Sequence, residues 1–156
     1  LVGDGAWLVP LVEKTAKACL AASGETLPAP GKKLAKPDPK IPWITDTYAS
    51  ALFKKVLDAL GMKDTLARVG KDGALRWQTS AEDAIRLAEL IAHRGEWHGR
   101  RFFSEETAAK EFPLPFAFGN RLFAEPDGTA SVLFSRKDVS SRPAFGPLVE
   151  SWRKVR

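Results

Sequence analysis

The residues best equipped for chemistry lie together in one segment, His93 to Phe103, which reads HRGEWHGRRFF. It holds two histidines, three arginines, a tryptophan and two phenylalanines. His93 and His98 could act as general base and acid in metal-free cleavage of RNA, because imidazole transfers protons near neutral pH. An arginine at position 100 or 101 would stabilise the extra negative charge. This chemistry requires both rings to converge on one phosphate, and a spacing of five residues does not establish that.

The same segment has the composition of a nucleic-acid contact. Arginines form charged hydrogen bonds with phosphates, and tryptophan stacks on bases or sugars. Cations elsewhere in the C-terminal half would extend this surface if folding brings them onto one face. The nucleic-acid-binding residues predicted on this basis are Arg94, Trp97, Arg100, Arg101, Lys110, Arg121, Arg136 and Lys137.

Two other interpretations of the aromatic residues stay open. Trp97, Phe102 and Phe103 could fill the core while the arginines extend to water over apolar surface. The segments PFAFG at 115–119 and PAFGP at 143–147 place phenylalanines among prolines and glycines, and exposed aromatic patches often mark protein partners. We favour binding of nucleic acid, and we favour DNA over RNA as the ligand. A protein-interaction module is the first alternative, and a small ribonuclease using His93 and His98 is the second.

The sequence offers little support for other chemistry. It has no glycine-rich phosphate loop and no Gly-x-Ser-x-Gly elbow. Its one cysteine, Cys19, excludes an internal disulfide and, with two histidines, argues against structural zinc. We therefore expect no cofactor, no metal and a non-catalytic protein. No apolar run approaches the roughly 18 residues of a membrane span, so we expect no membrane partner and a cytoplasmic location.

Composition and charge set the class of protein. The 156 residues suffice for one domain with a core, and 44% hydrophobic with 28% charged residues is typical of a globular chain. The net charge is +5, and the excess lies in residues 28–44 and 93–156, which carry +3 each. Attraction to phosphates becomes useful only if those charges share a face.

Periodicity and turn signals predict the elements that must position these residues. Residues 28–44 hold five prolines and four lysines, which predicts an extended basic linker or arm. Hairpins are expected around Lys71-Asp72-Gly73 and Pro126-Asp127-Gly128. Helices are predicted over residues 10–23, 45–61, 80–94, 104–112 and 147–155. The first three have one apolar face, and we expect Thr45 or Asp46 to cap the second and Ser80 to cap the third. The expected organisation is an N-terminal helical segment at 1–27, a linker at 28–44 and an α+β domain at 45–156.

From residue 45 the order helix, hairpin, helix, helix, hairpin, helix resembles two known arrangements. Residues 45–136 resemble a winged-helix domain, with helices at 81–93 and 104–112 followed by a hairpin at 121–136 as the wing. The resemblance implies that FSEETAAKEF is the recognition helix. The connection between the two helices is longer than the roughly 3–4 residues of a helix-turn-helix. The alternative succession, that of LAGLIDADG homing endonucleases, lacks their acidic paired-helix motif here, so no metal-binding or catalytic residue is carried over.

Overall fold

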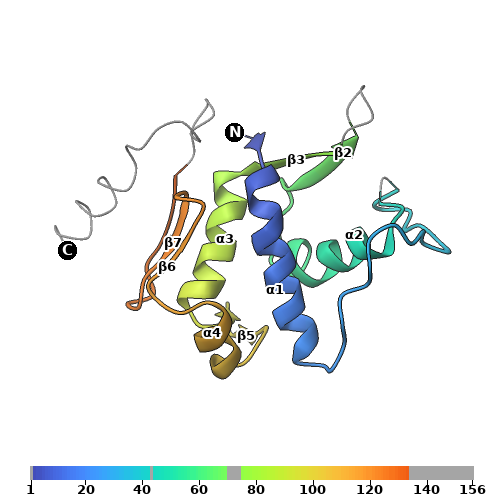
Figure 1. Cartoon of the computed structure of the whole chain (residues 1–156). Helices are drawn as coiled ribbons and strands as arrows, with labels where there is room; N and C mark the ends of the chain where they lie inside the picture. The colour runs from blue at the N-terminus through green and yellow to red at the C-terminus, as the bar shows by residue number, and fades with distance from the viewer. Residues whose placement is uncertain (1, 43, 70–74, 134–156) are drawn as a thin grey trace.

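The computed structural model describes residues 2–42, 44–69 and 75–133. These residues form a mixed α+β domain with four α-helices and three small antiparallel sheets (Figure 1). The predicted fold class is therefore confirmed. The winged-helix resemblance stays a prediction. The helix expected at 147–155 lies outside the described residues.

The first helix is part of the main core. A 3-10 turn, η1 (Ala6–Leu8), leads into α1 (Val9–Ala21), with Pro10 in the first turn, where a missing N–H has no consequence. Leu11 and Val12 are fully buried and belong to the same apolar cluster as side chains of α3 and β7. Helix α1 thus contributes to the core, while the domain boundaries at 27/28 and 44/45 stay predictions.

The proline-rich segment closes into a loop against the body of the protein. Leu34 N–H donates to the carbonyl of Thr45 at 2.8 Å, and Thr47 N–H donates to that of Lys32 at 2.8 Å. The carboxylate of Asp46 accepts from Gly31 N–H at 2.7 Å. Ile41 and Ile44 are buried within this loop. The expected extended connection is therefore replaced by a loop whose two ends are hydrogen-bonded together.

The second helix begins at the predicted cap. Asp46 accepts hydrogen bonds from the N–H groups of Tyr48 and Ala49, at the start of α2 (Thr47–Leu52). The helix continues as a π-helical turn, η2 (Phe53–Leu57), and the chain leaves the final turns at Gly61, which has a φ of +67°. A left-handed residue is the usual way for a helix to end.

A three-stranded antiparallel sheet connects the second and third helices. It consists of β1 (Val2–Asp4), β2 (Leu66–Val69) and β3 (Leu75–Ser80), in the order β1-β3-β2. The strands of the predicted first hairpin are confirmed, while its turn at 71–73 lies outside the described residues. Ser80 ends β3 and caps α3 (Ala81–Ala92) by accepting a hydrogen bond from Asp83 N–H at 3.1 Å. The cap predicted at Ser80 is confirmed.

Helix α3 lies at the centre of the domain (Figure 1). It is followed by β4 (Glu96–Trp97), β5 (Arg100–Arg101) and α4 (Glu105–Glu111). The chain then forms a second three-stranded sheet of β6 (Phe116–Phe118), β7 (Leu122–Ala124) and β8 (Ala130–Val132), of which β7 and β8 pack on α3. The turn predicted at 126–128 is confirmed, since Glu125 N–H donates to the carbonyl of Thr129 at 2.8 Å.

Candidate binding site at the end of helix α3

The segment His93–Phe103 forms a tight hairpin beyond the last turn of α3. Strands β4 and β5 are antiparallel, with Trp97 opposite Arg100. His98 and Gly99 connect them with φ values of +49° and +74°. Two successive positive φ angles are what a two-residue type I′ hairpin loop requires. The chain therefore reverses its direction sharply at His98 and Gly99, which the spacing of the two histidines could not predict.

The hairpin is fixed to the core at its base. Phe102 N–H donates to the carbonyl of Gly95 at 2.8 Å, and Phe103 is 1% exposed. Gly95 has a φ of +88°, and a Cβ atom there would lie 2.5 Å from the carbonyl oxygen of Phe103. Phe102 and Phe103 are buried, so for these two side chains the core-filling interpretation is confirmed, and Trp97 is only partly buried.

Arg101, predicted to contact phosphates, is engaged within the protein. Its guanidinium lies 2.9 Å from a carboxylate oxygen of Glu96 and 3.8 Å from one of Glu105. It also donates to the backbone carbonyls of Arg94 at 3.1 Å and Phe103 at 3.4 Å. Arg101 therefore ties the hairpin to the end of α3 and the start of α4, and two carboxylates offset its charge.

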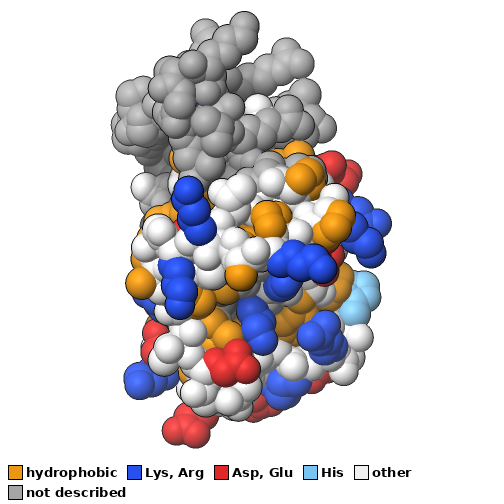
Figure 2. All heavy atoms as spheres, turned by 90° about the vertical axis from the view of Figure 1, so that its right-hand side faces the viewer, with side chains coloured by type: hydrophobic (Ala, Val, Ile, Leu, Met, Phe, Trp, Pro, Cys, Tyr) orange, Lys and Arg blue, Asp and Glu red, His pale blue; other side chains and the backbone are white. Residues whose placement is uncertain are grey.

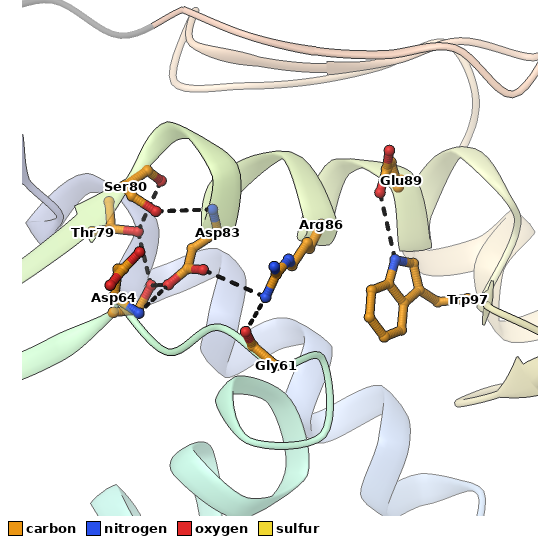
Figure 3. A network of polar contacts seen from close by, with 9 residues as sticks. Gly61, Asp64, Thr79, Ser80, Asp83, Arg86, Glu89 and Trp97 are labelled. Carbon is orange, nitrogen blue, oxygen red and sulfur yellow. Dashed lines mark hydrogen bonds and ion pairs between the residues drawn. The ribbon is translucent and has the colours of Figure 1, made fainter. Parts of the chain in front are cut away.

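Trp97 and the two histidines lie beside the same carboxylate-bearing turn of α3. The indole N–H of Trp97 donates to the carboxylate of Glu89 at 3.5 Å (Figure 3), and its ring centroid lies 4.1 Å from that of His98. His93 places Nδ1 2.8 Å from the carbonyl oxygen of Glu89. The β7–β8 turn approaches the same imidazole, since a Cβ atom on Gly128 would lie 3.3 Å from Nε2 of His93.

These side chains surround a cleft of about 500 Å³. The cleft is lined by Glu89, His93, Glu96, Trp97, His98, Gly99, Arg101 and Glu105. The lining holds three carboxylates and one guanidinium, so with neutral histidines it is negatively charged. A phosphate entering it would be repelled. Within the part of the chain that the structure describes, no group of three or more His, Cys, Asp or Glu side chains could hold a metal ion.

Three of the predicted cations stay accessible on the hairpin segment and α4. Arg94, Arg100 and Lys110 are all exposed, at the end of α3, on β5 and in the last turn of α4. The guanidinium of Arg100 lies over the ring of Phe102, 4.8 Å from its centroid. Among the described residues, none of these three cations forms an ion pair. They are therefore available to an anionic partner.

Arg121 contacts a different part of the molecule. Arg121 lies over the ring of Trp7, 5.4 Å from its centroid, at the end of β7 opposite the turn that approaches His93. Arg136 and Lys137 lie outside the described residues. Among the described residues of the predicted set, Arg94 and Arg100 belong to the hairpin segment, Lys110 lies on α4, and Arg121 packs beside the N-terminal turn η1.

A cation absent from the predicted set, Lys55, acts on the same thiol as Arg100. Burial raises the pKa of the Cys19 thiol to about 11, and the positive charges of Lys55 and Arg100 oppose this shift. Both cations therefore act on the same part of α1. The ammonium of Lys55 lies 3.7 Å from a carboxylate oxygen of Glu25.

Figure 2 shows the side of the molecule that lies to the right in Figure 1, where α2 and the proline-rich loop are found. Lysine and arginine side chains are distributed over this face with apolar side chains between them. The acidic side chains on it are fewer than the basic ones. The positive charge is thus spread over the face and is not concentrated in one continuous patch.

A second polar cluster, at the start of α3, has a structural role (Figure 3). The Asp83 carboxylate is 2% exposed and accepts hydrogen bonds from Asp64 N–H and the Thr65 hydroxyl, each at 2.8 Å. Arg86 lies 3.8 Å from the same carboxylate and donates to the carbonyl of Gly61. Burial raises the pKa of Asp83, while its hydrogen bonds lower it. The cluster fastens α3 to the loop after η2.

No protein-family model, no curated protein and no solved structure matches this chain. None of the helices in the described part of the chain is both long and apolar enough to span a membrane.

Proposed function

We propose that this protein binds nucleic acid, with DNA favoured over RNA, through the end of the molecule that carries the β4–β5 hairpin. The observation that supports this most is the set of three exposed cations, Arg94, Arg100 and Lys110, none of which has an ion-pair partner among the described residues. A cation whose charge is not already offset gains most from a phosphate. The net charge of +5 favours the same class of partner.

The surroundings of each residue suggest its role in binding. Arg100, Arg94 and Lys110 would contact phosphates. Lys55, whose ammonium lies 3.7 Å from a carboxylate oxygen of Glu25, would join them by exchanging that ion pair for a phosphate. Trp97 and His98, whose rings are in contact, would meet a base or sugar exposed beside the backbone. Arg101 would hold the hairpin in place without touching the ligand. The phosphates would pass outside the cleft, because its carboxylates repel them.

This proposal is tested by binding to fluorescently labelled duplexes and single strands at about 50 and 200 mM salt. Each phosphate contact contributes about 0.9 to the slope of log affinity against log salt. With three or four contacts we expect a slope of about 3 to 4 in magnitude. Replacing Arg100→Ala should lower that magnitude by about 1, because one contact is lost.

Arg121→Ala is the matched control, since it removes an arginine at the other end of β7. It should leave the slope unchanged. Equal losses from Arg100→Ala and Arg121→Ala would show that only the total charge matters. Undetectable binding of every strand at low salt would refute the proposal as a whole.

Metal-free ribonuclease activity is the second candidate, because His93 and His98 line one cleft. The three carboxylates of that cleft oppose it. RNA incubated in EDTA with the wild type and with His98→Ala decides this point: RNA that stays intact, or cleavage that persists in the variant, excludes the histidine mechanism.

The protein-interaction alternative would rest on Phe116 and Phe118 of β6, which are partly buried. Its second segment, 143–147, lies outside the described residues. A cytoplasmic location remains part of the proposal.

A further inference from the structure

We propose that the cleft beside the β4–β5 hairpin binds the cationic side chain of a protein partner, a lysine or arginine within a basic segment. This site shares Trp97 and His98 with the proposed base contact, but its charged groups are not the outer cations that would contact phosphates. It uses the carboxylates and the indole that line the cleft.

The lining comes from three elements that converge. Helix α3 presents Glu89 and His93 one turn apart, hence on the same face. The hairpin contributes Trp97, and the first turn of α4 contributes Glu105. Because the hairpin is fixed through Gly95 and Arg101, these walls are in place without a ligand.

Charge gives the cleft its preference. Arg101 engages Glu96 and Glu105, and Glu89 accepts from the indole of Trp97. One guanidinium does not offset three carboxylates, and each carboxylate has about four sites for hydrogen-bond donors. Acceptor capacity therefore remains for a further ammonium or guanidinium group.

The aromatic wall fits the same ligand chemistry. The hydrogen bond from its N–H to Glu89 fixes one edge of Trp97, and the ring contacts His98 on the hairpin turn. Tryptophan is the aromatic side chain that attracts cations most strongly. A carboxylate edge combined with an indole therefore selects an alkyl cation over a neutral or anionic group.

The size of the cleft points to a side chain on a peptide. Its volume of about 500 Å³ greatly exceeds the roughly 30 Å³ share of one water molecule. An inorganic cation would leave most of this space unfilled, while a lysine side chain with its neighbouring backbone would occupy it. Since the cleft is open to solvent, one isolated side chain should bind weakly, with a dissociation constant of about 10 mM or more.

The test follows the indole N–H signal of Trp97 by NMR during titration with N-acetyl-lysine-methylamide. The signal is assigned by its loss in Trp97→Phe. The neutral control ligand is N-acetyl-norleucine-methylamide, which has nearly the same shape without the charge. We expect a saturable shift of the Trp97 signal with the lysine compound, weakened by salt, and at least about fivefold weaker binding of norleucine.

Glu105→Gln supplies the variant arm, because its side chain is 70% exposed and its loss should not disturb folding. It should weaken lysine binding about two- to fivefold. Glu82→Gln, an exposed glutamate of α3 that does not line the cleft, should leave binding unchanged. Equal shifts with norleucine and lysine, or equal effects of the two variants, would overturn the proposal.

The nucleic-acid proposal can fail independently of this one. Arg100→Ala alters an outer cation that does not line the cleft. Lysine binding retained in Arg100→Ala supports separate sites, whereas its loss would contradict the assignment to the cleft.

Discussion

Asp83 shows how one residue can carry both a local and a distant role. Its backbone N–H donates to Ser80 Oγ as part of the helix cap, and its carboxylate turns inward to Asp64 and Thr65. The reciprocal capping box would have returned that side chain to the N–H of Ser80. A buried carboxylate is tolerated here because hydrogen bonds and Arg86 compensate part of its lost hydration.

Thr65→Val tests this compensation, because the two side chains have similar shapes. The variant loses a hydroxyl that donates to the Asp83 carboxylate and also contacts Thr79 Oγ1 at 2.9 Å. We expect its free energy of unfolding to fall by about 1–3 kcal/mol at pH 7. Urea denaturation measures this difference.

The pH dependence gives an independent check. The pKa of Asp83 is raised in the folded state, so the folded protein holds the proton more tightly than the unfolded chain. Its contribution to stability is therefore present at low pH and is lost as the pH rises through the folded pKa. The defect of Thr65→Val should shrink in acid, where the carboxyl is protonated. A defect that is the same at pH 4 and pH 7 would assign the loss to packing instead.

At the scale of the element, the β4–β5 hairpin defines the candidate site. Both of its glycines have positive φ, but only Gly95 is crowded: a Cβ atom there meets backbone and ring atoms of Phe103, while none lies within 4 Å at Gly99. Substitution at Gly99 therefore tests the effect of backbone conformation alone, while substitution at Gly95 adds the effect of steric contact.

Gly99→Ala should cost about 1–2 kcal/mol, the price of a left-handed non-glycine residue. Gly95→Ala should cost about 3 kcal/mol or more, because overpacking against Phe103 is added. Parallel urea denaturation of the two variants measures both losses. Similar losses would mean that the base of the hairpin adjusts freely, and its rigidity could not then be used to explain the cleft.

At the scale of the whole molecule, the described helices share one core. Leu11 of α1 is fully buried in the cluster that includes Leu87 of α3 and Leu122 of β7. A helix packed in this way should unfold together with the rest of the chain.

Leu11→Ala should lower the free energy of unfolding by about 2–5 kcal/mol, because a cavity forms in that common core. Circular dichroism and tryptophan fluorescence should report one coincident transition in both the wild type and the variant. Lys17→Ala, an exposed position of the same helix, should change stability by less than about 0.5 kcal/mol. Two separate transitions, with only one of them shifted, would show that the N-terminal helix is an independent unit.

The sequence by itself determined the local elements of this protein. Caps at Asp46 and Ser80 and the turn at 126–128 were predictable because the groups that form them are close in the chain. The helical periodicity likewise predicted which faces are buried. The prediction that the segment 93–103 carries the functional side chains stays a prediction.

Only the tertiary structure decided how that segment meets the rest of the chain. The positive charge of Arg101, on β5, is offset by the carboxylate of Glu105, on α4. The guanidinium of Arg121 packs on the ring of Trp7. The carboxylate of Asp46 accepts a hydrogen bond from Gly31 and so holds the two ends of the proline-rich loop together. Glu89 of α3 contributes one of the carboxylates that line the cleft. Such contacts join residues that local propensity does not relate, and they depend on how helices and sheets pack around a common core. The residue types therefore determine which charged groups the protein has, while packing determines which of those groups have an ion-pair partner.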